Sequence, residues 1–408
     1  MASARTSFLQ QCLGSSLMAT ASSMMAVMAP LYAVSLGLGV EWLGILMALP
    51  GIFPVLLALP AGRWIDAFGA ARWFYLGIVG MTTSPLLVVL FPGVTALALS
   101  RVLLGFFVLM FTLASQSLVA GLQNAKTHES NFAVYSTWLA AGRMVGPVVV
   151  GALIDTAGFR ISFAAVFAIL VVAAVIAYLV HRAAGPQGAG RLRGNPRPPG
   201  AVRATLRSVG LQMAVLTSAG VFLALTTREA FLPVLLERLG MSATLIGALV
   251  SLGSLSAVLT RPLMPLITKA LGGTGTALAV SMAAVSIGVG LLSAAQSVAA
   301  FAALAIVAGF GSGIAFPLSI VAVAAKVPLT HRGIALSLRL SINHSVEIFA
   351  PTLSGLVVAA TSLRFGFAAA GLALGLLTLL SFSLVKRFDA FAPAEGELLP
   401  GRSDQDVG

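Results

Sequence analysis

Long apolar segments, separated by short polar ones, run through almost the whole of this 408-residue chain. Hydrophobic residues make up 59% of it and charged residues only 9%, whereas about 25% of a soluble protein is charged. A helix of roughly 20 mostly apolar residues is long enough to cross a bilayer. Twelve segments meet this requirement: residues 9–35, 42–62, 73–91, 94–120, 132–152, 161–181, 209–236, 243–264, 275–295, 298–323, 334–359 and 365–385. The sequence therefore predicts an all-α integral membrane protein with twelve transmembrane helices.

The two halves of the chain repeat each other. Pro147 and Gly151 recur 204 residues later as Pro351 and Gly355, and near the start of each half the shift is 203 residues. Such a repeat predicts two pseudo-symmetric bundles of six helices, with an interface where one solute could be bound and released to either side. The repeat therefore indicates a transporter.

The apolar segments and the polar stretches between them divide the chain into four parts. We expect the six-helix bundles to occupy residues 1–181 and 208–387. Residues 182–207 contain several prolines and glycines and no acidic residue, which is typical of a flexible linker. The polar tail, residues 388–408, is expected to be disordered.

Basic residues are distributed unevenly between the loops. The linker and the other loops on its side carry most of the arginines and lysines, whereas the opposite loops contain only Arg160, Arg238 and Arg364. The positive-inside rule therefore places both termini in the cytoplasm, and we expect a multi-pass protein of a bacterial inner membrane. The net charge of +12 is then a signature of topology, and nucleic acid is excluded as a partner.

Residues suited to covalent or metal chemistry are scarce. The single cysteine, Cys12, cannot form an internal disulfide and is expected to be a packing residue. The pairs His128–Glu129 and His344–Glu347 come nearest to a catalytic site, but neither has further metal-ligating residues nearby in the sequence. We therefore expect no metal, no cofactor and no enzymatic activity.

The loop between the second and third predicted helices carries a motif. Residues 62–72 read GRWIDAFGAAR. This loop resembles the signature loop of the major facilitator superfamily, Gly-xxx-Asp-(Arg)-x-Gly-xx-Arg, although Ala67 replaces the arginine usual directly after the aspartate. The matching residues are Gly62, Asp66, Gly69 and Arg72.

Two further segments are similar to the same superfamily. Arg101 precedes Gly105 in the fourth predicted helix, where family members carry an arginine that is often linked to coupling. The fifth helix resembles the Gly-xxx-Gly-Pro-xx-Gly-Gly pattern of proton antiporters, with Val150 in place of one glycine. The matches there are Gly142, Gly146, Pro147 and Gly151. The resemblance implies the two-bundle transporter fold over essentially the whole chain, but it does not specify the substrate.

The resemblance also implies a role for Asp66 as a gating residue. In the family, this carboxylate binds the start of the eleventh helix in the outward-facing state, here around Arg332. The alternative is a carboxylate that is simply solvated at the membrane surface. Gly62 and Gly69 are expected to permit a tight turn and a close approach of helices.

The glycines and prolines of the fifth and eleventh helices have two interpretations. Proline removes a backbone donor and bends a helix, and small residues allow two helices to pack closely. Pro147, Pro351 and Gly355, with the fifth-helix glycines named above, could therefore form bent interface helices that seal one half against the other. Ordinary packing within a bundle would require the same residue types.

Charged residues within the spans are the strongest indication of a functional site, because each costs several kcal/mol in the bilayer unless it meets water or a partner. They are Arg101, Arg143, Arg228, Glu229, Arg339 and Glu347. Arg143 and Glu347 are repeat equivalents and are expected at matching depths in the two halves. Arg339 could instead extend toward the membrane surface. Arg228 and Glu229 could form a local pair or a gate.

The eleventh predicted helix is unusually polar. Asn343 and Glu347 are four residues apart and His344 and Glu347 three apart, so we expect all of them to meet on one helix face. Because histidine titrates near neutrality, this group could take up and release a proton during transport. A polar network that only holds helices together is the alternative.

Together these features predict a transporter that moves a small organic solute by alternating access between the two halves. We favour proton-coupled antiport that exports amphipathic or anionic compounds. An organic-anion uniporter or proton symporter is the alternative, because arginines outnumber glutamates within the spans and the first span lacks the acidic residue of many drug exporters. A membrane-embedded enzyme or a non-transporting scaffold are remote alternatives. The expected partners are the solute, protons and the lipid bilayer, and the chain is expected to be a monomer.

Overall fold

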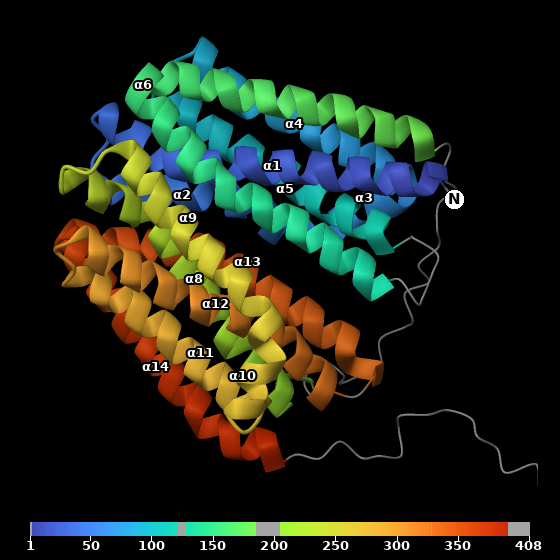
Figure 1. The fold of residues 1–408 in the computed structure, drawn as a ribbon, viewed down its shortest axis with the longest axis vertical. Coiled ribbons are helices and arrows are strands. Elements are labelled where there is room, and N and C mark those ends of the chain that lie inside the picture. The colour runs from blue at the N-terminus through green and yellow to red at the C-terminus, as the bar shows by residue number, and fades with distance from the viewer. Residues whose placement is uncertain (1, 121–127, 185–204, 328, 391–408) are drawn as a thin grey trace, which may run out of the picture.

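The computed structural model describes residues 2–120, 128–184, 205–327 and 329–390. Every regular element in these ranges is a helix, as the apolar segments predicted. Figure 1 shows the helices gathered into two groups, the first half of the chain above and the second half below. We refer to them as the N-terminal and C-terminal bundles.

The elements of each bundle follow the predicted spans closely. The N-terminal bundle contains α1 (Ala2–Ser35), α2 (Val40–Ala48), the 3₁₀ turn η1 (Leu49–Gly51), α3 (Ile52–Phe68), α4 (Ala70–Leu90), α5 (Val94–Ala120) and α6 (His128–Ala184). The C-terminal bundle contains α8 (Val209–Arg238), α9 (Ala243–Thr260), η2 (Arg261–Leu263), α10 (Met264–Ala270), α11 (Thr274–Gly290), η3 (Leu291–Ser293), α12 (Val298–Lys326), α13 (Leu329–Ala360) and α14 (Leu363–Ala390). The second span is therefore α2, η1 and α3 together, and the eighth is α9, η2 and α10.

Within the described residues, ten helical stretches are long and apolar enough to cross a membrane. One of them covers both arms of α6, where Gly158 has a positive φ of 76° and reverses the chain between the fifth and sixth spans. The polar helix α13 is not among the ten. Counting the two arms of α6 separately and adding α13 gives the predicted twelve helices.

The predicted boundaries of the four parts need small changes. Helix α6 continues to Ala184 and α14 to Ala390, so the first residues of the predicted linker and of the predicted tail are helical. Residues 185–204 and 391–408 lie outside the described residues.

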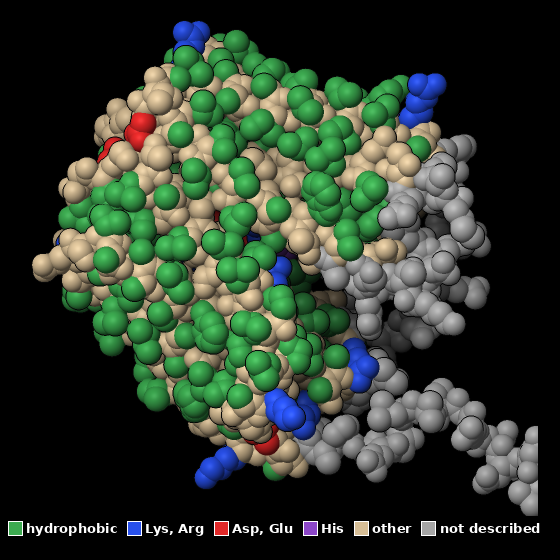
Figure 2. All heavy atoms as spheres, viewed as in Figure 1, with side chains coloured by type: hydrophobic (Ala, Val, Ile, Leu, Met, Phe, Trp, Pro, Cys, Tyr) green, Lys and Arg blue, Asp and Glu red, His purple; other side chains and the backbone are tan. Residues whose placement is uncertain are grey.

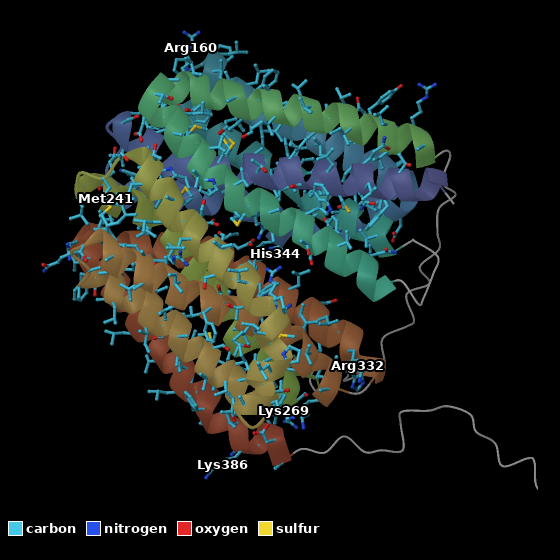
Figure 3. The ribbon with its side chains drawn as sticks, in the orientation of Figure 1. Arg160, Met241, Lys269, Arg332, His344 and Lys386 are labelled. Carbon is cyan, nitrogen blue, oxygen red and sulfur yellow. The ribbon has the colours of Figure 1, made fainter. Side chains whose placement is uncertain are left out.

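The two ends of the molecule differ in charge and in packing. Lys269, Arg332 and Lys386 lie at the end that also holds the N-terminus, whereas Arg160 and Met241 lie at the other end (Figure 3). We call these the basic end and the opposite end. In the space-filling view the molecule is hollowed between the bundles toward the basic end, with Lys or Arg side chains at its depth (Figure 2).

The bundles are joined chiefly through three helix pairs: α2 with α13, α6 with α9, and α1 with α8. The first two pairs are repeat equivalents and meet in the same way. A Cβ atom added at Gly44 would collide with the backbone carbonyl of Pro351, and one at Gly247 would collide with the carbonyl of Pro147. These two glycine–proline contacts, which we call the seams, bring the helix backbones together with no side chain between them.

The remaining interface residues divide between the two interpretations of the sequence. Gly151 and Gly355 also pack across the seams, against Ala243 on α9 and Gly44 on α2. Gly142 and Gly146 instead pack against α1 within their own bundle, where an added Cβ would collide with α1 atoms. The fifth-helix motif therefore makes both kinds of contact: one face of the helix packs against α1 in the same bundle, and an adjacent face packs against the other bundle.

Candidate functional site

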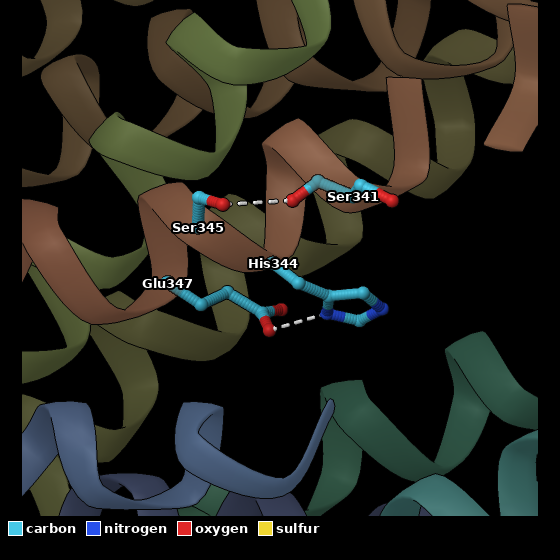
Figure 4. Close-up of polar contacts among 4 residues, drawn as sticks. All are labelled: Ser341, His344, Ser345 and Glu347. Carbon is cyan, nitrogen blue, oxygen red and sulfur yellow. Dashed lines mark hydrogen bonds and ion pairs between the residues drawn. The ribbon is translucent and has the colours of Figure 1, made fainter. Parts of the chain in front are cut away.

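Helix α13 presents a histidine–glutamate pair to the space between the bundles. His344 Nδ1 and a carboxylate oxygen of Glu347 are 2.8 Å apart, and their side chains are 19% and 29% exposed. Figure 4 shows both side chains extending from α13 toward the blue and teal ribbons of the N-terminal bundle. The predicted contact between these two residues is therefore present, and both side chains are accessible to solvent.

Asn343 does not join this pair. Its side chain is 1% exposed, and its Oδ1 accepts a 2.9 Å hydrogen bond from the Ser218 hydroxyl of α8. Its Nδ2 has no hydrogen-bond partner among the described atoms. Asn343 therefore does not meet Glu347 as expected, because α8 covers Asn343 while Glu347 extends into space that solvent reaches.

Arg339 lies within the C-terminal bundle and does not extend to the membrane surface. It is 5% exposed, and its guanidinium donates to the Ser319 hydroxyl of α12 at 2.8 and 3.1 Å. The same group lies 4.9 Å from the centroid of the Phe316 ring, a favourable cation–π distance. Arg339 therefore acts as a tie between α12 and α13.

Glu229 lies within electrostatic range of several of the remaining charges. These are the guanidinium groups of Arg143, Arg101 and Arg228 and the carboxylate of Glu347, although Glu229 forms no ion pair with any of them among the described residues. These residues come from four helices, α5, α6, α8 and α13, and therefore from both bundles. The structure thus brings together five of the six charged residues that the sequence placed inside the spans.

The three arginines around Glu229 differ in their access to solvent. Arg101 is 6% exposed, and its Nε has no hydrogen-bond partner among the described atoms. Arg228 lines an internal cavity of about 10 Å³ with Leu232 and Phe301, which is room for at most a water molecule. Arg143 is exposed. A solute entering the hollow could therefore reach Arg143 directly, but the other two only if side chains move.

The loop that resembles the family signature is not engaged with the other bundle. Gly69 ends α3 with a positive φ of 90°, which confirms the predicted tight turn. The Asp66 side chain is exposed, with no hydrogen bond or ion pair to any described residue. Arg72 lies 6.0 Å from the Phe68 ring centroid, and Arg332 Nε donates to the Val327 carbonyl. The close helix approach predicted at Gly62 was wrong, because nothing lies within 4 Å of an added Cβ there.

One inter-bundle contact was missed by the sequence analysis. Asp155, near the end of the first arm of α6, accepts hydrogen bonds from the backbone N–H groups of Ala243 and Thr244 and from the Thr244 hydroxyl. The signal was a carboxylate just past the end of a predicted span, where the repeat places Ala359 in the second half.

Two bundles that meet along paired helices, with charged side chains from both halves near their interface, define a membrane transporter. A model of the Major Facilitator Superfamily matches residues 12–295 and 217–399. The chain therefore belongs to the Major Facilitator Superfamily.

Individual relatives agree with this assignment. Multidrug resistance protein 2 of Bacillus subtilis (strain 168) is 28% identical over 138 residues, about a third (34%) of each chain. Among solved structures, a bacterial homologue of the human lysosomal transporter Spinster, in an inward-facing and unoccupied conformation, has a TM-score of 0.78 at 16% identity, covering 96% of this chain and 99% of its own. A peptide transporter in complex with sulfate has a TM-score of 0.77 at 14% identity, covering 94% of each chain. At these identities the solved structures establish the fold alone.

Proposed function

We propose that this protein is a proton-coupled antiporter that exports a small amphipathic or anionic organic compound. The observation that carries the proposal is the 2.8 Å contact between His344 and Glu347, which lies in solvent reach between the two bundles. A carboxylate and an imidazole in contact can exchange one proton between them and release it to water. A purely structural pair in a membrane helix has no need of this access.

The proposed cycle uses the position of the pair at the interface of the bundles. When the hollow faces the acidic side of the membrane, the pair gains a proton, and when it faces the cytoplasm the pair loses the proton. Loss of the proton changes the charge next to Glu229 and its arginines, and therefore the affinity of the site for a charged solute. Alternating access between the bundles then converts the proton gradient into export.

The orientation we propose follows from the basic residues. The basic end faces the cytoplasm, with both termini, because lysines and arginines favour that side. In the conformation described here the hollow then opens to the cytoplasm, where a compound to be exported would enter. The name of the Bacillus subtilis relative, a multidrug resistance protein, is consistent with export from the cell.

A second function is supported by a different observation. Arg143 is exposed, and Arg143, Arg101 and Arg228 all lie within electrostatic range of Glu229. An excess of guanidinium groups suits a carboxylate, phosphate or sulfonate group on the solute. An organic-anion uniporter or proton symporter would use these arginines as its binding site; the uniporter would move no protons, and the symporter would carry them in the same direction as the solute.

Inside-out membrane vesicles would distinguish these functions. Respiration acidifies the vesicle interior, a pH-sensitive dye reports the gradient, and a panel of amphipathic cations and organic anions is added in turn. We expect at least one compound to collapse the gradient with the wild type and not with Glu347→Gln. Glu41→Gln, which alters an exposed carboxylate on α2, is the matched control and should behave as the wild type.

The opposite outcome is equally informative. If no compound alters the gradient, while labelled organic anions enter vesicles at the same rate with the wild type and Glu347→Gln, proton coupling is excluded. In that case an Arg143→Gln variant should abolish the uptake, and Glu347 would be a structural residue.

A further inference from the structure

The start of helix α9 is completed by a side chain from the other bundle. The first backbone N–H groups of a helix have no partner within the helix and must find one elsewhere. Ser242, the residue that precedes α9, accepts only from Leu245 N at 3.3 Å. Asp155 of α6 accepts from Ala243 N at 2.9 Å and from Thr244 N at 2.8 Å. Two of the first three N–H groups of α9 are therefore satisfied from across the bundle interface.

The chemistry of this contact favours a closed interface. Carboxylates are stabilised near helix N-termini, and hydrogen bonds to a charged acceptor are stronger than those to a neutral one. The Thr244 hydroxyl adds a third hydrogen bond, at 2.6 Å, to the carboxylate oxygen that Thr244 N also contacts. Directly beside it, Gly151 packs against the Ala243 carbonyl so closely that an added Cβ would collide. The contact therefore forms only when α6 and α9 are packed closely and in this alignment.

This contact has no counterpart in the other half of the repeat. Asp155 corresponds to Ala359 on α13, which has no side chain to offer to the start of α2. Gly39, which precedes α2, makes no side-chain cap either. The two seams are symmetric, but the carboxylate contact is confined to the α6–α9 seam. A feature required only for helix packing would be expected at both.

We propose that Asp155 is a latch that holds the opposite end closed, and that its release from α9 is a step in opening that end. The inference rests on the alternating access of the proposed function, since a latch matters only if the bundles separate there. On separation, the N–H groups of Ala243 and Thr244 exchange the carboxylate for water. The latch thus sets the proportion of molecules open at the opposite end.

Distance measurements between spin labels would test the latch directly. With Cys12 replaced by alanine, one label pair at Arg160 and Arg238 reports the opposite end, and a pair at Arg182 and Lys269 reports the basic end. All four residues are exposed. We expect Asp155→Asn and Asp155→Ala to lengthen the first distance, shorten the second, and raise the ratio of open to closed opposite ends about tenfold.

A labelling rate extends the test to a rarely populated open state. Ile348 packs against Gly51 of the other bundle, so an Ile348→Cys thiol should react with a membrane-impermeant reagent applied at the opposite end only when that end opens. We expect the rate to rise with Asp155→Asn by the same factor. Thr156→Val is the matched control, because the exposed Thr156 hydroxyl bonds only to Ala152 of its own helix.

A bulky residue at a seam separates failure of the latch from failure of alternating access. Gly247→Leu should force the opposite end open, because its side chain would collide with the Pro147 carbonyl. If Gly247→Leu opens that end while the Asp155 variants match the wild type, the latch is wrong and the proposed function stands. If none of the variants changes either distance, the bundles do not alternate, and both proposals fail.

Discussion

The opposite end and the basic end place the same chemical group in two different situations. At the opposite end, the Asp155 carboxylate is bound by the first N–H groups of α9. At the basic end, the Asp66 carboxylate is exposed and has no partner among the described residues. Both carboxylates belong to the N-terminal bundle and lie near a helix terminus. The same chemical group is therefore bound across the bundle interface at one end and exposed at the other, which is the arrangement expected if only the opposite end is closed in this conformation.

The two ends also show a difference between the seams and the two carboxylates. The seams obey the repeat, since Gly44 meets Pro351 as Gly247 meets Pro147. Both carboxylates break it, because positions 270 and 359 are alanines. Symmetric backbone contacts allow the bundles to move against each other in a balanced way. Because each carboxylate is present in one half only, its contact with the other bundle can form and break independently of the contact at the other end.

The largest effect is expected from filling the seams. Gly44→Ala and Gly247→Ala should each prevent closure of the opposite end, because the new methyl group collides with a proline carbonyl and overpacking costs about 1–3 kcal/mol. Spin-label distances at that end should lengthen, and the transport rate should fall by at least about tenfold. Gly375→Ala, where the methyl group would make only an ordinary contact at 3.6 Å from Ser286 Oγ, is the matched control and should leave distances and transport unchanged. Equal behaviour of all three variants would mean that the seams do not govern closure.

An intermediate effect is expected at the basic end. Asp66→Asn should leave the distances of the conformation described here unchanged, because the carboxylate makes no contact in it. It should reduce transport several-fold, because the conformation closed at the basic end loses a charge-assisted hydrogen bond of about 1.5–3 kcal/mol. Transport in vesicles and distances between labels at Arg182 and Lys269 would measure the two effects.

Asp389→Asn provides the control for that experiment. Asp389 also lies at the basic end, but beside Gly273 and Gly275 at the start of α11 in its own bundle. Its substitution should not alter inter-bundle distances. A transport loss equal to that of Asp66→Asn would attribute the effect to surface charge and would contradict a gating role for Asp66.

The smallest effect is expected from trimming the latch. Thr244→Val removes one hydrogen bond to Asp155 and keeps the backbone N–H that makes another. A single hydrogen bond contributes about 1 kcal/mol, so the open fraction of the opposite end should rise about fivefold, less than with Asp155→Ala. Adding Thr244→Val to Asp155→Ala should have no further effect. Additive effects of the two substitutions would show that Thr244 acts separately from the latch.

Much of the fold could be predicted from the sequence because membrane helices are specified by length and hydrophobicity. The segments around α1, α5, α8 and α12 agree with the described helices to within a few residues at most ends. The turn η1 was not predicted, because Pro50 interrupts a span whose hydropathy is continuous. The reversal at Gly158 also left no long polar loop to mark it, since a single positive φ is sufficient.

The candidate site was only partly predictable, because sequence spacing specifies a helix face but not the neighbour that covers it. The spacing of His344 and Glu347 was a sufficient guide, since both belong to one helix and contact each other. Asn343 lies on nearly the same face of α13 as Glu347 but is covered by α8. No local sequence pattern reveals which neighbouring helix will cover a given residue. The Asp155 contact joins residues 88 and 89 positions apart in different bundles, so it depends wholly on how the halves meet.

The prolines of the two seams have a consequence for the centre of the protein that does not involve any side chain. A proline has no N–H to donate to the carbonyl four residues before it. For Pro147 that carbonyl belongs to Arg143, and for Pro351 it belongs to Glu347. Each charged position thus also carries a backbone oxygen without its ordinary helical donor, one in each half and related by the repeat. Each of these oxygens needs a donor from outside its own helix, and that need persists through any side-chain substitution at positions 143 and 347.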